Sequence, residues 1–176
     1  MGSLSVEQVD ALRPYIAGRV VTDLGSGIDL VLADQLLQIG AAGVVAVDPL
    51  VVLRQDGWDD PVDPRIKLRP QLFVDFADDI DVAFMSWPKM YAVDGLTEAA
   101  ARSPTVIYLG KNAGGASCGS VSLFRHFARR EVLAHVPDDK NTLIVYGGAL
   151  AGPRELLAEE RCAIDRRAIH RHARGG

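Results

Sequence analysis

The stretch that most constrains the fold runs from Val20 to Asp29 and joins a short strand to a glycine turn. Its first five residues are β-branched or apolar apart from Asp23, a composition that predicts a buried strand. The strand continues directly into Gly25-Ser26-Gly27, and a helical pattern follows. Glycines let the backbone come close to a ligand, and a helix N-terminus presents unpaired N–H groups. This order of elements predicts a nucleotide-type cofactor site.

Strand and helix patterns alternate along most of the remaining chain. Short apolar strands are expected at residues 20–24, 43–48, 65–68, 80–85 and 105–109. Their almost continuous apolar character indicates burial on both faces, as in a parallel sheet between helices. Two further strands, 131–136 and 142–146, are separated by a short polar turn and predict an antiparallel hairpin at the sheet edge.

Helices are expected at residues 5–17, from 28 or 29 to 39, and at 94–102, 120–129 and 154–169. The predicted fold is therefore α/β, with a Rossmann-like, mostly parallel, seven-stranded sheet that ends in an antiparallel hairpin and has helices on both faces. Residues 1–152 are expected to form the cofactor-binding domain. Residues 153–176 are expected to form a C-terminal helix and a basic tail.

The composition indicates a cytoplasmic protein without membrane contact. The chain has 176 residues, of which 48% are hydrophobic, and its mean hydropathy is +0.11. No apolar run approaches the roughly 20 residues that span a bilayer, and the first residues do not resemble a signal peptide. Cys118 and Cys162 are expected to be free thiols.

The charge is negative overall but uneven along the chain. A net charge of −4 argues against general affinity for nucleic acid. Five arginines and two histidines nevertheless lie between Arg161 and Arg174, against the single acid Asp165. This pattern indicates a solvated helix face, or alternatively a contact for RNA, an acidic partner or a phosphorylated substrate. We expect a small-molecule substrate, and the sequence leaves a homodimer open.

Three pieces of the sequence, in their order, resemble the class I S-adenosylmethionine-dependent methyltransferases over roughly residues 5–147. Val21 to Gly27 is similar to that family's first motif, in which an acid stands two residues before a pair of glycines spaced by one. Ala46-Val47-Asp48 is similar to the acid at the tip of the second strand, and Ser86-Trp87-Pro88 takes the place of the fourth motif. The expected hairpin matches the family's sixth and seventh strands.

The resemblance implies S-adenosylmethionine as the cofactor. The expected cofactor contacts are Asp23, Gly25, Ser26, Gly27, Asp48, Pro49 and Asp75. The glycine turn lets backbone groups reach the amino-acid part and the ribose, and a carboxylate at Asp48 can accept both ribose hydroxyls. Asp23 is placed to accept from the ammonium group or to orient the turn. Asp75, or alternatively Asp78, is the candidate for the adenine amine.

The candidate catalytic residues are Ser86, Trp87 and Tyr91. Trp87 is interpreted either as an aromatic wall over a flat substrate or as a core or lid tryptophan. Lys89, Tyr91 and Asp94 are candidates for proton handling, because methyl transfer from a sulfonium needs a positioned nucleophile and sometimes a base. No metal site is expected, since His170 and His172 stand too close together for two ligands on one helix face.

Two other classes of protein remain as alternatives. A non-catalytic protein of the same fold is favoured by the small size and by Ser86-Trp87-Pro88-Lys89, which lacks the Asn/Asp-Pro-Pro-aromatic signature of enzymes that methylate exocyclic amines. An NAD(P)-binding reductase is disfavoured by the terminal hairpin and by Asp29. An acid at that position, near a fingerprint glycine, would repel a pyrophosphate.

Overall fold

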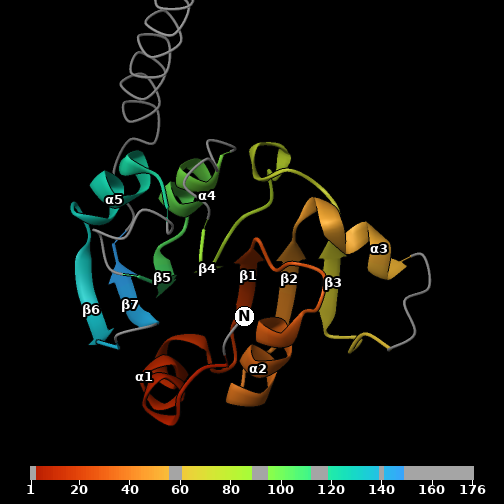
Figure 1. Cartoon of the computed structure of the whole chain (residues 1–176), viewed down its shortest axis with the longest axis horizontal. Coiled ribbons are helices and arrows are strands. Elements are labelled where there is room, and N and C mark those ends of the chain that lie inside the picture. Colours follow the sequence, from red (N-terminus) through yellow and green to blue (C-terminus); the bar gives the residue numbers. More distant parts are fainter. Residues whose placement is uncertain (1–2, 56–60, 89–94, 112–118, 139–140, 149–176) are drawn as a thin grey trace, which may run out of the picture.

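Seven strands form one sheet in the described part of this computed structural model, which comprises residues 3–55, 61–88, 95–111, 119–138 and 141–148. The strands are β1 (Val20–Leu24), β2 (Gly43–Val47), β3 (Ile66–Arg69), β4 (Val82–Ser86), β5 (Thr105–Gly110), β6 (Glu131–Val136) and β7 (Thr142–Gly147). Their order is β3-β2-β1-β4-β5-β7-β6, which Figure 1 shows from right to left. The first five strands run parallel, and β7 is antiparallel to both of its neighbours. The predicted fold class is confirmed.

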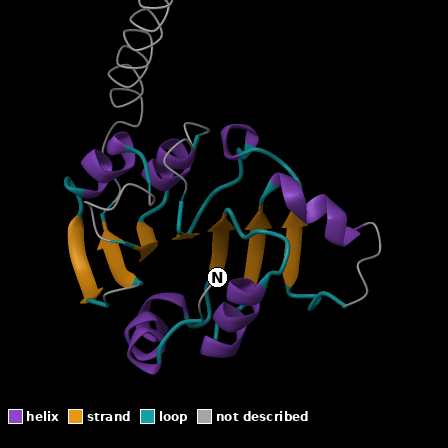
Figure 2. Ribbon diagram, in the orientation of Figure 1, coloured by secondary structure: helices purple, strands orange, loops and turns teal. Residues whose placement is uncertain are grey.

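Helices lie on both faces of this sheet, as Figure 2 shows. They are α1 (Val6–Ile16), α2 (Val31–Ile39), α3 (Val52–Gln55), α4 (Leu96–Arg102), α5 (Val121–Phe127) and the 3₁₀ helices η1 (Pro49–Val51) and η2 (Phe73–Asp75). Residues of α1 and α2 belong to one hydrophobic core, and residues of α4 and α5 belong to the other. Within the described ranges, no helix combines the length and the apolar character that a membrane crossing requires.

The two cores arise from the alternation of side chains along the central strands. Val21, Phe84 and Ile107 are fully buried on the α1 and α2 side, whereas Met85 and Tyr108 are fully buried on the opposite side. Side chains of a strand point alternately to the two faces of a sheet. Because helices cover both faces here, nearly every position of the central strands must be apolar, which explains the continuous apolar runs in the sequence.

The start of α2 differs from the sequence prediction. The helix begins at Val31, not at residue 28 or 29, and its N-cap Leu30 has the left-handed backbone conformation of φ 55° and ψ 15°. The turn that follows β1 is therefore longer than its glycines alone indicate. The predicted helix at residues 154–169, and with it the proposed boundary after residue 152, lies outside the described residues.

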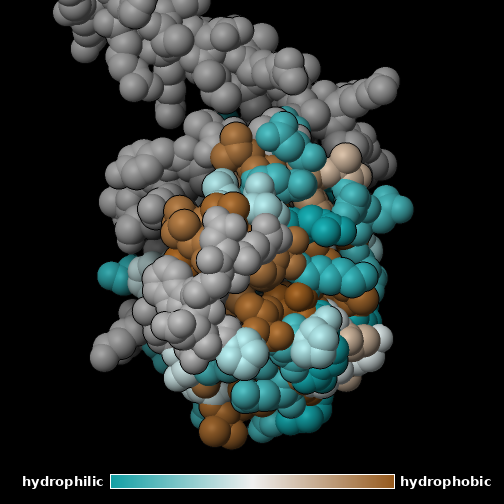
Figure 3. Space-filling view, turned by 90° about the vertical axis from the view of Figure 1, so that its right-hand side faces the viewer, coloured by the Kyte–Doolittle hydropathy of each residue, from teal (hydrophilic) through white to brown (hydrophobic). Residues whose placement is uncertain are grey.

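The β3 side of the sheet exposes apolar side chains. Leu50 is 54% exposed, and Leu53 and Leu72 are each 46% exposed. Figure 3, which views the molecule from this side, shows apolar surface among polar groups. These residues belong to or adjoin η1, α3 and η2, so the surface around the ends of β2 and β3 is partly apolar.

A buried polar pair joins α5 to the end of α4. His126 is fully buried, and its Nε2 accepts a hydrogen bond of 2.9 Å from Nε of Arg130. Arg130 Nη2 donates to the carbonyl oxygens of Ala100, at 2.7 Å, and Ser103, at 2.8 Å. Since Nε2 accepts, the neutral imidazole carries its proton on Nδ1. Burial, together with the charges of Arg130 and Arg129, lowers the pKa of His126 to about 4.

This buried histidine is expected to reduce stability below neutral pH. In the unfolded chain His126 takes up a proton near pH 6.5, whereas the native protein resists protonation down to about pH 4. The free energy of unfolding should therefore fall between pH 6.5 and pH 4, by about 3 kcal/mol from this group. Urea unfolding at pH 7, 5.5 and 4.5 would measure the loss. His126→Gln keeps an acceptor for Arg130 and does not titrate, so its free energy of unfolding should fall less over this pH range. An equal fall in both proteins would show that His126 is not the group that titrates.

Candidate functional site

The glycine turn lies at the point where the sheet order reverses. Strands β2 and β3 extend from one side of β1, and β4 and β5 extend from the other, so the loops after β1 and β4 diverge. Gly25 and Gly27 have φ angles of 88° and 68°, a region that glycine adopts without steric cost. A Cβ at Gly25 would lie 3.6 Å from Cζ of Phe73 in η2. The phenyl ring of Phe73 therefore borders the turn.

Asp48 joins this turn to the end of β2. Its Oδ2 accepts from the backbone N–H of Gly27 at 3.2 Å, and its Oδ1 accepts from the N–H of Leu50 at 2.8 Å. The same carboxylate thus holds the glycine turn and caps η1. A carboxylate offers about four acceptor positions. Asp48 can therefore still accept hydrogen bonds from two ligand hydroxyls.

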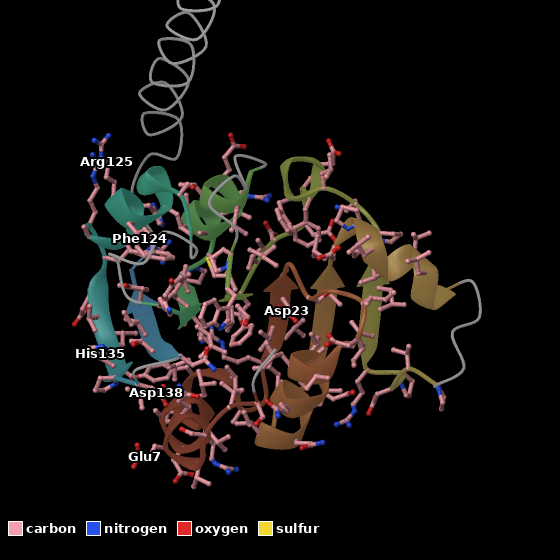
Figure 4. All side chains as sticks on the ribbon, in the orientation of Figure 1. Glu7, Asp23, Phe124, Arg125, His135 and Asp138 are labelled. Carbon is pink, nitrogen blue, oxygen red and sulfur yellow. The ribbon has the colours of Figure 1, made fainter. Side chains whose placement is uncertain are left out.

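Asp23 is a buried acid without a described partner. The residue is 1% exposed, and neither carboxylate oxygen has a hydrogen-bond partner among the described residues. Figure 4 shows it near the carboxyl end of β1. Burial, and then the negative charges of Asp48 and Asp29, raise the pKa of Asp23 to about 7. Burying an unpartnered carboxylate is costly, so this position favours a ligand that carries a positive charge.

Ser86 is a second polar residue whose side chain has no partner in the described part of the chain. It ends β4, is 9% exposed, and its Oγ lacks a hydrogen bond there. In the parallel register Asp23 lies opposite Phe84, two residues before Ser86. Because side chains alternate along a strand, Asp23 and Ser86 face the same side of the sheet. The carboxylate and the hydroxyl thus form one polar area across β1 and β4.

Trp87 follows Ser86 and has an unusual backbone conformation. Its φ angle is 47°, a value that residues other than glycine rarely adopt. Its backbone N–H donates to the carbonyl of Leu109 at 2.7 Å, and its indole Nε1 donates to Oδ1 of Asn141. The half-buried side chain packs against the core formed with α4 and α5.

The other predicted cofactor contacts lie in this turn, in η1 and in η2. Ser26 is buried within it, and its hydroxyl donates to the carbonyl of Gly27 at 3.4 Å. Pro49 begins η1 directly after Asp48, and the exposed Asp75 ends η2. The roles of Pro49 and Asp75 stay predictions.

Three candidate residues have no described position. Tyr91, Lys89 and Asp94 lie outside the described residues. In contrast, six of the predicted residues lie at or directly after the carboxyl ends of β1, β2 and β4, at one edge of the sheet. These residues are Asp23, Gly25, Ser26, Gly27, Asp48 and Ser86.

Three residues at this edge were not identified from the sequence. Phe73 borders the glycine turn, and Asn141 holds the indole of Trp87. Gln8 donates from Nε2 to the backbone carbonyl of Asn141. The spacing of Ser5 and Gln8 is typical of a capping box, which the structure contains, but its link to the turn before β7 depends on the tertiary fold.

Comparison with known proteins identifies the fold. No protein-family model and no curated protein matches the sequence. Magnesium protoporphyrin IX methyltransferase from Synechocystis PCC 6803, with bound S-adenosylhomocysteine, matches with a TM-score of 0.57 at 12% identity over 84% of this chain and 90% of that chain. TrmK of M. capricolum, in complex with S-adenosylhomocysteine, matches with a TM-score of 0.52 at 14% identity over 84% of this chain and 70% of that chain.

An S-adenosylmethionine-dependent methyltransferase from Mesorhizobium loti gives a TM-score of 0.51 at 14% identity, over 83% of this chain and 98% of that chain. The protein therefore has the fold of the class I S-adenosylmethionine-dependent methyltransferases, as its sequence predicted. At these identities the likeness concerns the fold.

Proposed function

We propose that this protein is an S-adenosylmethionine-dependent methyltransferase that acts on a small-molecule acceptor. The observation that carries the proposal is the buried carboxylate of Asp23, which has no described partner and lies beside a glycine turn held by Asp48. S-adenosylmethionine brings an ammonium group, a sulfonium and two ribose hydroxyls. A cation near Asp23 satisfies the buried charge, and hydroxyls near Asp48 use its remaining acceptor positions.

Each residue then has a definite task. Asp23 pairs with the positive charge of the amino-acid part, and the turn from Gly25 to Gly27 lies against that part and the ribose without side chains in the way. Asp48 orients the ribose, while Pro49 and Asp75 border the adenine. The bound cofactor supplies a methyl group on a positively charged sulfur.

Ser86, Trp87 and Tyr91 are proposed to face the acceptor. Their task is to hold the nucleophilic atom in line with the methyl group and to exclude water, because this displacement depends mainly on positioning. Ser86 has a hydroxyl available for a polar group of the acceptor. The net charge argues against contacts of residues 161–174 with nucleic acid, and such contacts and a homodimer stay alternatives that the sequence leaves open.

A second candidate function is binding of the same cofactor without catalysis. The observation that favours it is the sequence Ser86-Trp87-Pro88-Lys89, which lacks the acceptor signature of enzymes that methylate exocyclic amines. A nicotinamide-dependent reductase fits less well. Asp29 lies in the turn before α2, where a pyrophosphate would need positive or neutral surroundings.

Calorimetry with S-adenosylmethionine, S-adenosylhomocysteine and NADPH separates these functions. The wild type should bind the first two compounds, and Asp48→Ala should weaken both by about 10- to 100-fold, because the loss of a hydrogen bond to a charged group costs about 1.5–3 kcal/mol. Asp10→Ala, which removes an exposed acid of α1, is the matched control and should bind as the wild type does.

Other results would overturn the proposal or favour its alternative. NADPH binding without a response to the other two compounds would contradict the proposed cofactor. Binding of S-adenosylhomocysteine without turnover of any compound in a broad acceptor panel would favour the non-catalytic function.

A further inference from the structure

We propose that Trp87, held by Asn141, is a fixed stacking surface that selects a planar aromatic acceptor. The inference rests on the proposed function, because it names the acceptor class of the same site. Trp87 is the specificity-determining residue in this proposal. Asn141 and Gln8 are positioning residues that act through it.

Trp87 lies at the edge of the sheet that holds the candidate site. It follows Ser86 at the carboxyl end of β4, next to the polar area formed with Asp23. Its N–H donates to the carbonyl of Leu109, so the pairing of β4 with β5 extends through this residue. In the next pair Gly110 lies opposite Thr142, so Asn141, directly before Thr142, lies at the same edge of the sheet.

The indole ring of Trp87 is held by hydrogen bonds that involve several parts of the chain. Asn141 accepts from the indole N–H of Trp87, and its own N–H donates to Oδ1 of Asp138 at 3.0 Å. Its carbonyl accepts from Nε2 of Gln8 in α1.

The backbone of Trp87 is consistent with such a fixed position. A φ angle of 47° is unfavourable for tryptophan and persists only where surrounding contacts impose it. The hydrogen bonds to Leu109 and Asn141 supply these contacts. Backbone strain of this kind is commonly found at binding sites.

The hydrogen bond to Asn141 limits the interactions that the indole ring can offer a ligand. Its N–H is already used by Asn141, so the remaining interaction that it offers a ligand is through its π surface. The side chain packs against one core, and the residue as a whole is only half-buried. Aromatic rings prefer offset-stacked or edge-to-face partners. A planar acceptor therefore gains a contact that a saturated one of equal size does not.

The test compares two neutral probes of matched size, 2-naphthol and its saturated analogue decahydro-2-naphthol. Their binding to the full chain saturated with S-adenosylhomocysteine is measured by saturation-transfer NMR titration. The wild type should bind 2-naphthol at least tenfold more tightly. Trp87→Leu should remove this preference, and Trp87→Phe should retain most of it. All variants should bind S-adenosylhomocysteine within threefold of the wild type.

The role of Asn141 is tested by a matched pair of variants. Asn141→Leu removes the acceptor of the indole N–H and should reduce the preference for 2-naphthol at least fivefold, whereas Asn141→Asp keeps an acceptor and should restore it. A second readout is the fluorescence anisotropy of Trp87 in a Trp58→Phe background, in which it is the remaining tryptophan. Asn141→Leu should lower this anisotropy.

The outcomes distinguish this inference from the proposed function. Equal binding of both probes by the wild type would overturn the inference, and this comparison needs no variant that could misfold. Unchanged probe preference and anisotropy in Asn141→Leu would overturn the positioning role. Both probes are also titrated without S-adenosylhomocysteine. Failure of the wild type to bind S-adenosylhomocysteine, with the preference for 2-naphthol intact in this second titration, would overturn the proposed function alone.

Discussion

Asp23→Asn should stabilise the protein without ligand and weaken the binding of S-adenosylmethionine by about 100-fold. The pKa of Asp23 is raised from 3.8 to about 7 in the native protein. The contribution of this group to stability is therefore complete below pH 3.8 and is lost as the pH rises through 7. At pH 8 the loss of stability is on the order of 4 kcal/mol. A neutral amide of the same shape does not ionise, so Asp23→Asn should avoid this loss.

The effect on binding has the opposite sign, because the ligand's positive charge would lose its partner. Removing one member of a buried charge pair typically costs 2–5 kcal/mol, and about 3 kcal/mol corresponds to roughly 100-fold in affinity. Urea unfolding at pH 5 and pH 8, together with calorimetry of both proteins, measures the two effects. An Asp23→Asn protein that is less stable at pH 8, or that binds the cofactor normally, would contradict the role assigned here. Asp10→Asn is the control for a change of net charge.

Arg130→Ala is expected to produce the largest loss of stability, about 3 kcal/mol. Arg130 is 7% exposed and donates to His126 and to the carbonyls of Ala100 and Ser103. Burial lowers its pKa to about 10, so it is still charged at neutral pH and interacts favourably with the C-terminal end of α4. Its removal leaves two carbonyls and an imidazole without their donor, and each unsatisfied buried group costs about 1–3 kcal/mol.

Chemical unfolding at pH 7 measures this loss. Arg125→Ala, on the exposed side of α5, is the matched control and should change the free energy of unfolding by less than about 0.5 kcal/mol. The loss of stability in Arg130→Lys should lie between those of Arg125→Ala and Arg130→Ala, because a single ammonium cannot reproduce the planar arrangement of guanidinium donors. A loss below about 1 kcal/mol in Arg130→Ala would show that the carbonyls find other donors.

The strands of this protein could be predicted closely because their signals are local. The apolar run of β1 and the two runs around the polar turn of the final hairpin lie where the sequence places them, with β6 at residues 131–136 in both. Strand periodicity and turn composition depend on neighbouring residues. The glycines and the acids at the ends of β1 and β2 could also be predicted, because their signals depend on neighbouring residues.

The start of α2 could not be predicted in this way. The residues from Ile28 onward have helical character, but Leu30 takes a left-handed conformation and delays the helix to Val31. Leucine rarely adopts this conformation by itself, so the surrounding structure must impose it. Local propensity gives no sign of such a constraint.

By itself, the sequence determined the class of fold, the glycine turn and the two acids beside it, because each depends on residue type and short spacing. Only the tertiary structure decided the state of these groups. It buried Asp23 without a described partner, turned the carboxylate of Asp48 onto Gly27, and joined Trp87 to Asn141, 54 residues away. Burial and long-range hydrogen bonds depend on which strands become neighbours, and that order is a property of the folded chain.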